Sequence, residues 1–170
     1  MRNLVLFLLF FVAVAVCTQD GLAQTTSPHG FSRDWCTWFV DFRESDLGWN
    51  LQFVPRSNRN ACNWANVITN AKCIGGPTPG AIMVIGPWNG NALGHVAVVE
   101  SVCGDGRWLV SQTSGPGFPA WPGRPVCYRG ATVYYTYWGY VPGSGNRLVW
   151  RFDNWGNHGL ALPLVAFLSR

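Results

Sequence analysis

The chain has few charged side chains, and those it has are not clustered. Asp, Glu, Lys and Arg make up 12% of its 170 residues, and no run of Lys or Arg occurs. A surface that binds nucleic acid concentrates positive charge, so we expect no nucleic-acid partner. The formal net charge of +4 is dispersed, which suits an anionic target such as a cell wall but is equally compatible with ordinary solubility.

Long apolar runs are also scarce, and the main one lies at the start of the chain. Thirteen residues from Leu4 to Val16 carry no charge and are followed by the small-residue sequence at 21–23. This run is shorter than a helix needs to span a bilayer and is typical of a secretory signal peptide. We predict a signal peptide over residues 1–23 and a mature domain over residues 24–170, secreted or periplasmic and without membrane contact after cleavage.

Cys17 leaves a second interpretation of this region open, because lipoproteins are anchored through a cysteine near the end of the signal. Val16 stands where an attachment site usually has a small residue, so we favour a cleaved signal. The mature chain has the length of one domain with a single core. It contains no internal repeat, and we expect it to be a monomer.

A calcium-binding loop is missing as well. Asp41, Glu44 and Asp46 lack the Asp-x-Asp-x-Asp-Gly spacing of such loops and are most simply the solvated end of a helix. We therefore predict no metal and no other cofactor.

Helix signals come first in the mature chain. Four bulky residues recur with the period of one helix face: Trp35, Trp38, Phe39 and Phe42. They predict a helix over residues 32–43, whose first turn Ser32 or Asp34 can cap. A shorter helix is predicted over residues 63–72, and residues 44–60 between them are predicted to form a loop.

Strand signals follow. Residues 81–86 form a short apolar run, and GHVAVVESVCGDGRWLVSQTS, residues 94–114, contains two β-branched runs joined through a turn, which predicts a β-hairpin. Residues 115–125 are predicted to form an irregular loop. Two more strands are predicted around PGSGN, residues 142–146. This order predicts an α+β fold in which N-terminal helices pack on an antiparallel sheet, completed by an extended hairpin and tail from residues 128–170.

The register of the first hairpin can be worked out. If Gly104 and Asp105 form a two-residue loop, the numbers of opposed residues sum to 209, and His95 lies opposite Ser114. Since alternate residues share a face, His95, Gln112 and Ser114 project from the same side, with Gln112 within reach of His95.

Five cysteines remain after signal cleavage, an odd number that leaves one without an intramolecular partner in an oxidising compartment. Four cysteines allow three pairings, of which sequence proximity favours Cys62–Cys73 with Cys103–Cys127. Cys36 is then the free thiol, in the first turn of a helix, where the dipole and unpaired amides favour a thiolate and lower its pKa. A structural or disulfide-bonded cysteine is the plainer alternative.

A nucleophilic cysteine needs a histidine to take its proton, a polar residue to hold the imidazole and amides to receive the oxyanion. Cys36, His95 and Gln112 or Ser114 supply these groups. The stretches CTWFV, NWA, PGAIMVIG and GHVAVVESV followed by GDGRWLVSQ, within residues 36–112, resemble the CHAP family of cysteine- and histidine-dependent amidohydrolases and peptidases. The resemblance implies a papain-like core and cleavage of peptidoglycan amide bonds through a thioester, with Cys36 as nucleophile, His95 as base and Gln112 as orienting residue.

Two residues depart from the pattern of that family. Gln112 stands where many members have a glutamate, and Ser114 where an asparagine is common. An uncharged glutamine can fix the tautomer of His95 but stabilises its imidazolium less than a carboxylate does, which favours a slower or more neutral Cys–His pair. A secreted cell-wall or glycan-binding protein with weak or no catalysis is therefore the alternative function.

The ten tryptophans are mostly expected in the core. Trp88 and Trp121 are exceptions, because the Gly and Pro residues around them indicate exposed loops, and with Ser114 they are predicted to contact substrate. The predicted partner is peptidoglycan or its stem peptides. A toxin against competing bacteria with the same chemistry is a third interpretation, which implies an inhibitor or immunity protein in the producer.

Overall fold

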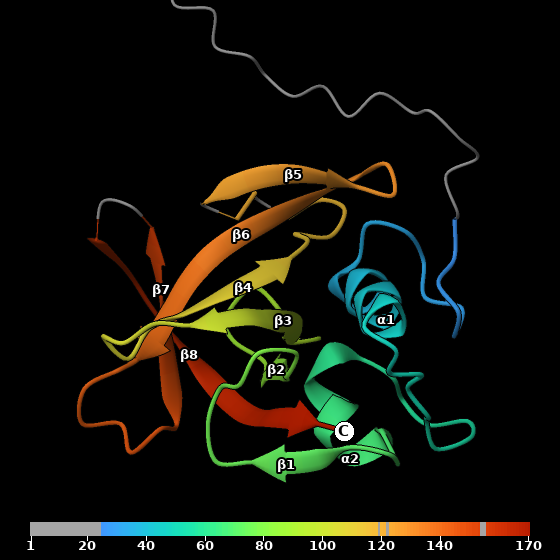
Figure 1. Ribbon diagram of the computed structural model, residues 1–170, viewed down its shortest axis with the longest axis horizontal. Coiled ribbons are helices and arrows are strands. Elements are labelled where there is room, and N and C mark those ends of the chain that lie inside the picture. Colours follow the sequence, from blue (N-terminus) through green and yellow to red (C-terminus); the bar gives the residue numbers. More distant parts are fainter. Residues whose placement is uncertain (1–24, 119, 122, 154–155) are drawn as a thin grey trace, which may run out of the picture.

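A computed structural model describes residues 25–170, apart from residues 119, 122, 154 and 155 (Figure 1). The predicted signal peptide lies outside the described residues. The elements are α1 (Cys36–Asp46), the 3-10 turn η1 (Ala61–Asn63), α2 (Trp64–Val67), β1 (Lys72–Ile74), β2 (Ile82–Ile85), β3 (His95–Val102), β4 (Trp108–Gln112), β5 (Arg124–Tyr128), β6 (Ala131–Tyr140), β7 (Leu148–Asp153) and β8 (Gly156–Ser169). No helix among the described residues is long and apolar enough to cross a membrane.

The strands form one antiparallel sheet in the order β1-β8-β2-β3-β4-β6-β5. Strand β7 pairs with both β6 and β8, so the pairings through β8, β2, β3, β4, β6 and β7 close into a ring. Helices α1 and α2 lie outside this ring (Figure 1). The predicted α+β class, with N-terminal helices on an antiparallel sheet, is confirmed.

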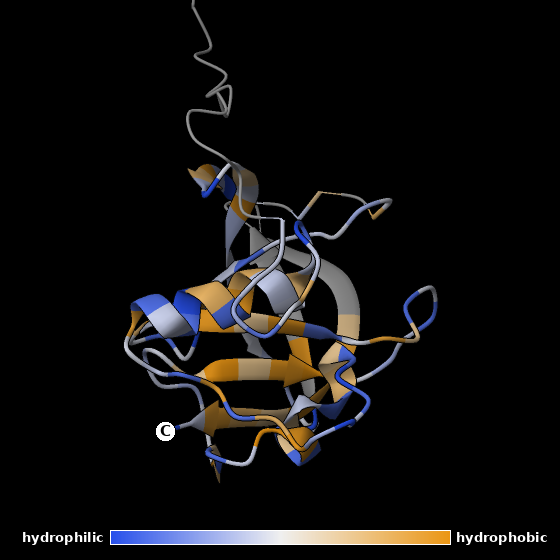
Figure 2. Ribbon diagram, turned by 90° about the vertical axis from the view of Figure 1, so that its right-hand side faces the viewer, coloured by the Kyte–Doolittle hydropathy of each residue, from blue (hydrophilic) through white to orange (hydrophobic). Residues whose placement is uncertain are grey.

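The sheet separates two hydrophobic cores. Alternation along β3 directs Val96 and Val98 to the first core, which they share with α1, and Ala97 and Val99 to the second. The second core draws on all six strands of the ring and therefore fills its interior. In Figure 2 the central strands are hydrophobic, whereas the connecting turns are mostly hydrophilic.

Helix α1 begins later than predicted. The chain turns at Asp34, whose φ is 71°, and Trp35 occupies the position before the first helical residue without a side-chain hydrogen bond to the helix. We predicted that Ser32 or Asp34 would cap α1, and neither does. Cys36 is consequently the first helical residue, and its amide has no acceptor within the helix.

The predicted register of the β3–β4 hairpin is correct on the side of the bulge that carries His95 and Gln112, although the loop was predicted wrongly. The amide of Cys103 donates to the carbonyl of Arg107 at 2.7 Å, so the loop has three residues and not two. A bulge at Glu100 compensates, and Val98 lies opposite Ser111 as the sum of 209 requires. Two deviations of one residue cancel, because a bulge shifts the register by one position.

Three strands were missed, β1, β5 and β8, and the second helix is shorter than predicted. Strand β8 lies in the predicted tail and pairs with β1, β2 and β7. Helix α2 ends at Val67, because residues 72–74 form the edge strand β1 on β8 instead of continuing the helix. Strand β5 begins within the predicted irregular loop 115–125 and pairs with β6.

Neither predicted disulfide forms. Cys62, Cys73 and Cys103 are free thiols, as is Cys36. Cys103 lies at the loop end of β3, whereas Cys127 lies on β5, beyond β4 and β6. Cys73 lies exposed on β1, while Cys62 lies in η1. Proximity in sequence was a poor guide for Cys103 and Cys127 because β4 and β6 lie between them in the sheet. The free state of Cys36 does not follow from the cysteine count.

Candidate active site

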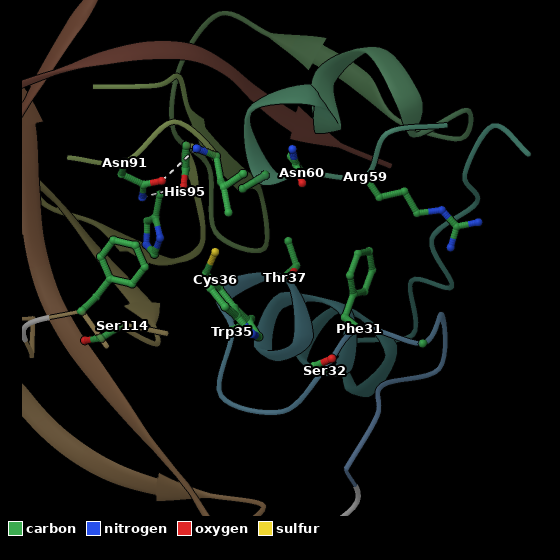
Figure 3. A pocket seen from close by; sticks show the side chains of 15 residues that line it. Phe31, Ser32, Trp35, Cys36, Thr37, Arg59, Asn60, Asn91, His95 and Ser114 are labelled. Carbon is green, nitrogen blue, oxygen red and sulfur yellow. Dashed lines mark hydrogen bonds between the residues drawn. The ribbon is translucent and has the colours of Figure 1, made fainter. Parts of the chain in front are cut away.

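Cys36 lines a cavity of about 350 Å³. The cavity walls come from residues 30–32, 35–37, 59–61, 91 and 93–95 and from Ser114 and Phe118 (Figure 3). Cys36 itself is 8% exposed, and in Figure 3 its sulfur points into the cavity.

His95, the first residue of β3, lines the same cavity and is 3% exposed. The backbone of Val96, the next residue, interacts with the Cys36 thiol, and in Figure 3 the sulfur and the imidazole ring face the same space. The structure therefore brings together the two residues that the sequence placed about sixty positions apart.

Gly94 allows His95 to take this position. Its φ is +71°, and a Cβ atom there would lie 2.5 Å from the carbonyl oxygen of Ile85 and 2.7 Å from the Cβ of Cys62. Both the backbone conformation and the space thus require glycine directly before the histidine.

A buried hydrogen-bond chain holds the imidazole. His95 Nε2 lies 2.8 Å from Gln112 Oε1, and Gln112 Nε2 donates to Thr136 Oγ1 at 3.0 Å. Gln112 and Thr136 are 0% and 1% exposed. Because Thr136 accepts from the amide nitrogen, the amide oxygen faces the imidazole. Nε2 of His95 then carries the hydrogen, and Nδ1 is left as the nitrogen that can take a proton.

Trp121 packs against the other side of this chain. Its ring centroid lies 4.8 Å from that of His95, its amide donates to Ser114 Oγ at 3.1 Å, and its Nε1 donates to the carbonyl of Thr113 at 3.1 Å. Of the three residues predicted to contact substrate, Ser114 lines the cavity, whereas Trp121 and Trp88 do not. Both indoles pack against the core inside the strand ring.

Burial keeps both reacting groups uncharged. It raises the pKa of the Cys36 thiol to about 11, although backbone amides of Val96, Thr37 and Cys36 itself act in the opposite direction. It lowers the pKa of His95 to about 4, against the effect of the Gln112 hydrogen bond. The expected lowering of the thiol pKa at the helix start is therefore wrong, because desolvation outweighs the amides.

Asp41 and Glu44 on α1 do not belong to a solvated helix end as predicted, whereas Asp46, the last residue of α1, is exposed. Asp41 is buried and accepts hydrogen bonds from Ser27 Oγ at 2.5 Å, from the amide of His29 at 2.9 Å and from His29 Nδ1 at 2.7 Å. Glu44 is fully buried, and burial raises its pKa to about 8. The contacts of Asp41 fix the N-terminal segment on α1, which positions the cavity wall at residues 30–32.

A second, charged cluster joins α1 to the hairpin. Arg43 Nε and Nη2 donate to the two carboxylate oxygens of Glu100 at 3.1 and 2.8 Å. Ser111 Oγ donates to the same carboxylate at 2.5 Å. Glu100 continues the alternation of Val96 and Val98, so it faces α1. The cluster holds the helix that carries Cys36 against the strand that carries His95.

Several cavity residues were not identified from the sequence, among them Phe31, Arg59, Asn60, Asn91 and Phe118. Arg59 and Asn60 belong to the predicted loop 44–60, which has no periodicity or motif that would have singled them out. In the part of the chain that the structure describes, no three His, Cys, Asp or Glu side chains group closely enough to hold a metal ion.

Comparisons with known proteins bear on the family and on the fold. The sequence pattern described as the CHAP domain matches residues 28–114, and no curated protein matches the sequence. Two structures of Ly7917, one of them "with the hydrolyzing product of MDP", have TM-scores of 0.52 and 0.50 and identities of 16% and 15%. The alignments cover 81% of this chain and 54% and 53% of theirs, so the chain spans about half the length of Ly7917.

A third structure, of an N-acetylmuramoyl-L-alanine amidase from Staphylococcus aureus, is 18% identical over 79% of this chain and 31% of its own, with a TM-score of 0.45. At identities this low, the likeness to Ly7917 shows a shared fold and no more.

Proposed function

The chain belongs to the CHAP family, and from this premise we propose that it hydrolyses amide bonds of peptidoglycan through a thioester acyl-enzyme. The observation that carries the proposal is the meeting of Cys36 and His95 at one cavity, with Gln112 holding the imidazole. The fold shared with Ly7917, which was solved with a hydrolysis product of MDP, supports the substrate class.

Each step has a residue to perform it. The sulfur of Cys36 attacks the amide carbonyl carbon while Nδ1 of His95 takes the thiol proton. The resulting oxyanion lies near the start of α1, where the amide of Cys36 has no helical acceptor and can donate to it. The C–N bond then breaks, and the leaving amine receives the proton from His95.

Deacylation reverses the roles. A water molecule gives a proton to His95 and attacks the thioester carbonyl, the C–S bond breaks, and the sulfur recovers its proton from the imidazolium. Because thiol and imidazole are both neutral before substrate binds, the first proton transfer accompanies the attack on the carbonyl. That requirement makes the chemical step slower than in a preformed thiolate–imidazolium pair.

Export belongs to the same proposal. Residues 1–23 are assigned to a signal peptide, so the mature protein acts outside the cytoplasm, where peptidoglycan lies. Amino-terminal sequencing of the protein recovered from the medium or periplasm checks this. A first residue close to position 24 is expected, and retention of the original amino terminus would contradict it.

The neutral Cys–His pair also favours a second candidate function, binding of cell wall with little catalysis. One experiment separates the two. Purified sacculi are incubated with the mature protein, with Cys36→Ala or with Cys73→Ala, and the muropeptides are analysed by mass spectrometry. Cys73 is an exposed free thiol outside the cavity, so its variant is the matched control.

We expect new amide-cleavage termini with the wild-type protein and with Cys73→Ala, but none with Cys36→Ala. The masses of the new termini identify the scissile bond. Intact muropeptides with all three proteins, together with sedimentation on sacculi, would support the binding function instead.

A further inference from the structure

We propose that Arg59 recognises a carboxylate of the substrate, so that the enzyme prefers stem peptides with a free acidic group over peptides in which this group is an amide. This inference rests on the proposed function and adds to it the chemical class of stem peptide that the cavity selects.

The charge distribution of the cavity carries the inference. Arg59 is the only one of the described lining residues with a permanent charge, and no Asp or Glu is among them. It forms no ion pair with any carboxylate in the described part of the chain. Among the described residues that line the cavity, the half-buried guanidinium of Arg59 therefore interacts most strongly with an anion that enters it.

The guanidinium is already held in place. Its Nη1 donates to the carbonyl of His29 at 3.3 Å, and its Cζ lies 5.0 Å above the ring of Phe53. His29 is in turn fixed by the buried carboxylate of Asp41. These contacts use one of five N–H donors, so the planar group is preorganised and can still bind a carboxylate.

The position of Arg59 suits recognition rather than chemistry. In Figure 3 Arg59 lies on the side of the cavity opposite His95 and Ser114, beyond Thr37 and Phe31 as seen from Cys36, and its guanidinium points outward, away from Cys36. A bound peptide can therefore present its scissile carbonyl to Cys36 and a separate carboxylate to Arg59. Stem peptides contain such carboxylates, and some cell walls convert them into amides, so the choice distinguishes real substrates.

The test uses two synthetic muropeptides that differ only in carrying glutamate or isoglutamine at the second stem position. Values of kcat/KM are measured for the wild-type protein, Arg59→Gln, Arg59→Lys and Arg56→Gln. Arg56 is exposed and does not line the cavity, so Arg56→Gln removes the same charge three residues away. Glutamine at position 59 keeps a donor for the His29 carbonyl.

We expect the wild-type protein and Arg56→Gln to prefer the acidic muropeptide by about tenfold, the scale of a charge-assisted hydrogen bond. Arg59→Gln should lose this preference because kcat/KM falls for the acidic muropeptide and not for the amidated one. Arg59→Lys should keep part of the preference. A merely structural role of Arg59 would lower both rates together. Raising the salt concentration should reduce the wild-type preference.

Equal wild-type rates on the two muropeptides, unchanged in Arg59→Gln, would overturn the role of Arg59 and leave the proposed hydrolase intact. Absence of Cys36-dependent cleavage of both muropeptides would overturn the hydrolase. Binding then decides the role of Arg59 on its own: calorimetry with Cys36→Ala should show tighter binding of the acidic muropeptide, and equal binding of the two would refute it.

Discussion

The two faces of strand β3 hold their polar groups in opposite ways. On the face toward the strand ring, His95, Gln112 and Thr136 form an uncharged chain that is almost completely buried. On the face toward α1, Glu100 is part of a charged cluster with Arg43, and both side chains keep some solvent exposure, 17% and 27%. Desolvation explains the difference, since a charge is tolerated where solvent and a partner remain.

The comparison separates reactivity from attachment. The uncharged chain sets the tautomer of the base, whereas the charged cluster holds the helix that carries the nucleophile. Substitutions on the face toward the strand ring, the inner face, should therefore alter catalysis. Substitutions on the face toward α1, the outer face, should alter stability.

Replacing the base should have the largest effect. His95→Ala removes the group that takes the Cys36 proton, and general base catalysis contributes on the order of 10²–10⁴ in rate. We expect kcat to fall by about a thousandfold in muropeptide hydrolysis, with the circular dichroism spectrum unchanged. A variant that keeps a tenth of the wild-type rate would show that another group takes the proton.

Thr136→Val tests how the inner chain orients the base. Without an acceptor for Gln112 Nε2, the amide can turn its NH2 group toward His95, which favours the wrong tautomer. We expect kcat to fall about tenfold, the order of one hydrogen bond to a buried group. Thr136→Ser should restore the rate.

The double variant decides whether this loss reflects orientation. A carboxylate is symmetric, so in the Gln112→Glu background Thr136→Val should cost much less than in the wild type. Equal losses in both backgrounds would mean that Thr136 acts by packing alone.

The pH profile should show the neutral pair directly. Since burial lowers the pKa of His95 to about 4 and raises that of Cys36 to about 11, kcat/KM should stay level across neutral pH and fall only as the pH drops toward 4 or rises toward 11. Folding stability follows the same signs. It should be lost as the pH falls from about 6.5 toward 4, because only the unfolded chain then binds the proton, and as the pH rises above about 9.

Gln112→Glu should narrow this profile. A carboxylate beside the imidazole stabilises its protonated form, so the pKa of His95 should rise by about one unit or more and move the acid limb upward. Iodoacetamide alkylation of Cys36 near neutral pH should be slow in the wild type and faster in this variant. An acid limb that does not move would indicate that the new side chain is itself protonated.

The smallest effect on activity is expected on the outer face. Glu100→Gln leaves Arg43 without its carboxylate and should lower the free energy of unfolding by about 1–2 kcal/mol in urea denaturation. The kcat of the folded protein should stay within about twofold of the wild type. Asp105→Asn breaks an exposed pair with Arg107, and because solvent screens this pair, the free energy of unfolding should not change measurably. A large fall in kcat for Glu100→Gln would place the outer face in the catalytic machinery.

Local patterns in the sequence determined the helix that carries Cys36, the buried strand at 82–85, and the β3–β4 hairpin. Periods of 3.6 and 2 residues reflect which face of an element is buried, so the alternation placed Gln112 beside His95 without any tertiary information. It could not supply Thr136, because the register of β6 against β4 involves strands that no short turn connects.

Only the tertiary structure decided which cysteines are free, whether the groups of the site are charged, and that Arg59 lies at the cavity. Cys103 and Cys127 are separated by strands whose order the sequence does not reveal. The pKa of Cys36 depends on the desolvation imposed by residues distant in sequence, which reverses the effect expected from the helix start alone. Arg59 reaches the cavity through a loop without periodicity, so contacts between distant segments, and not local pattern, place it there.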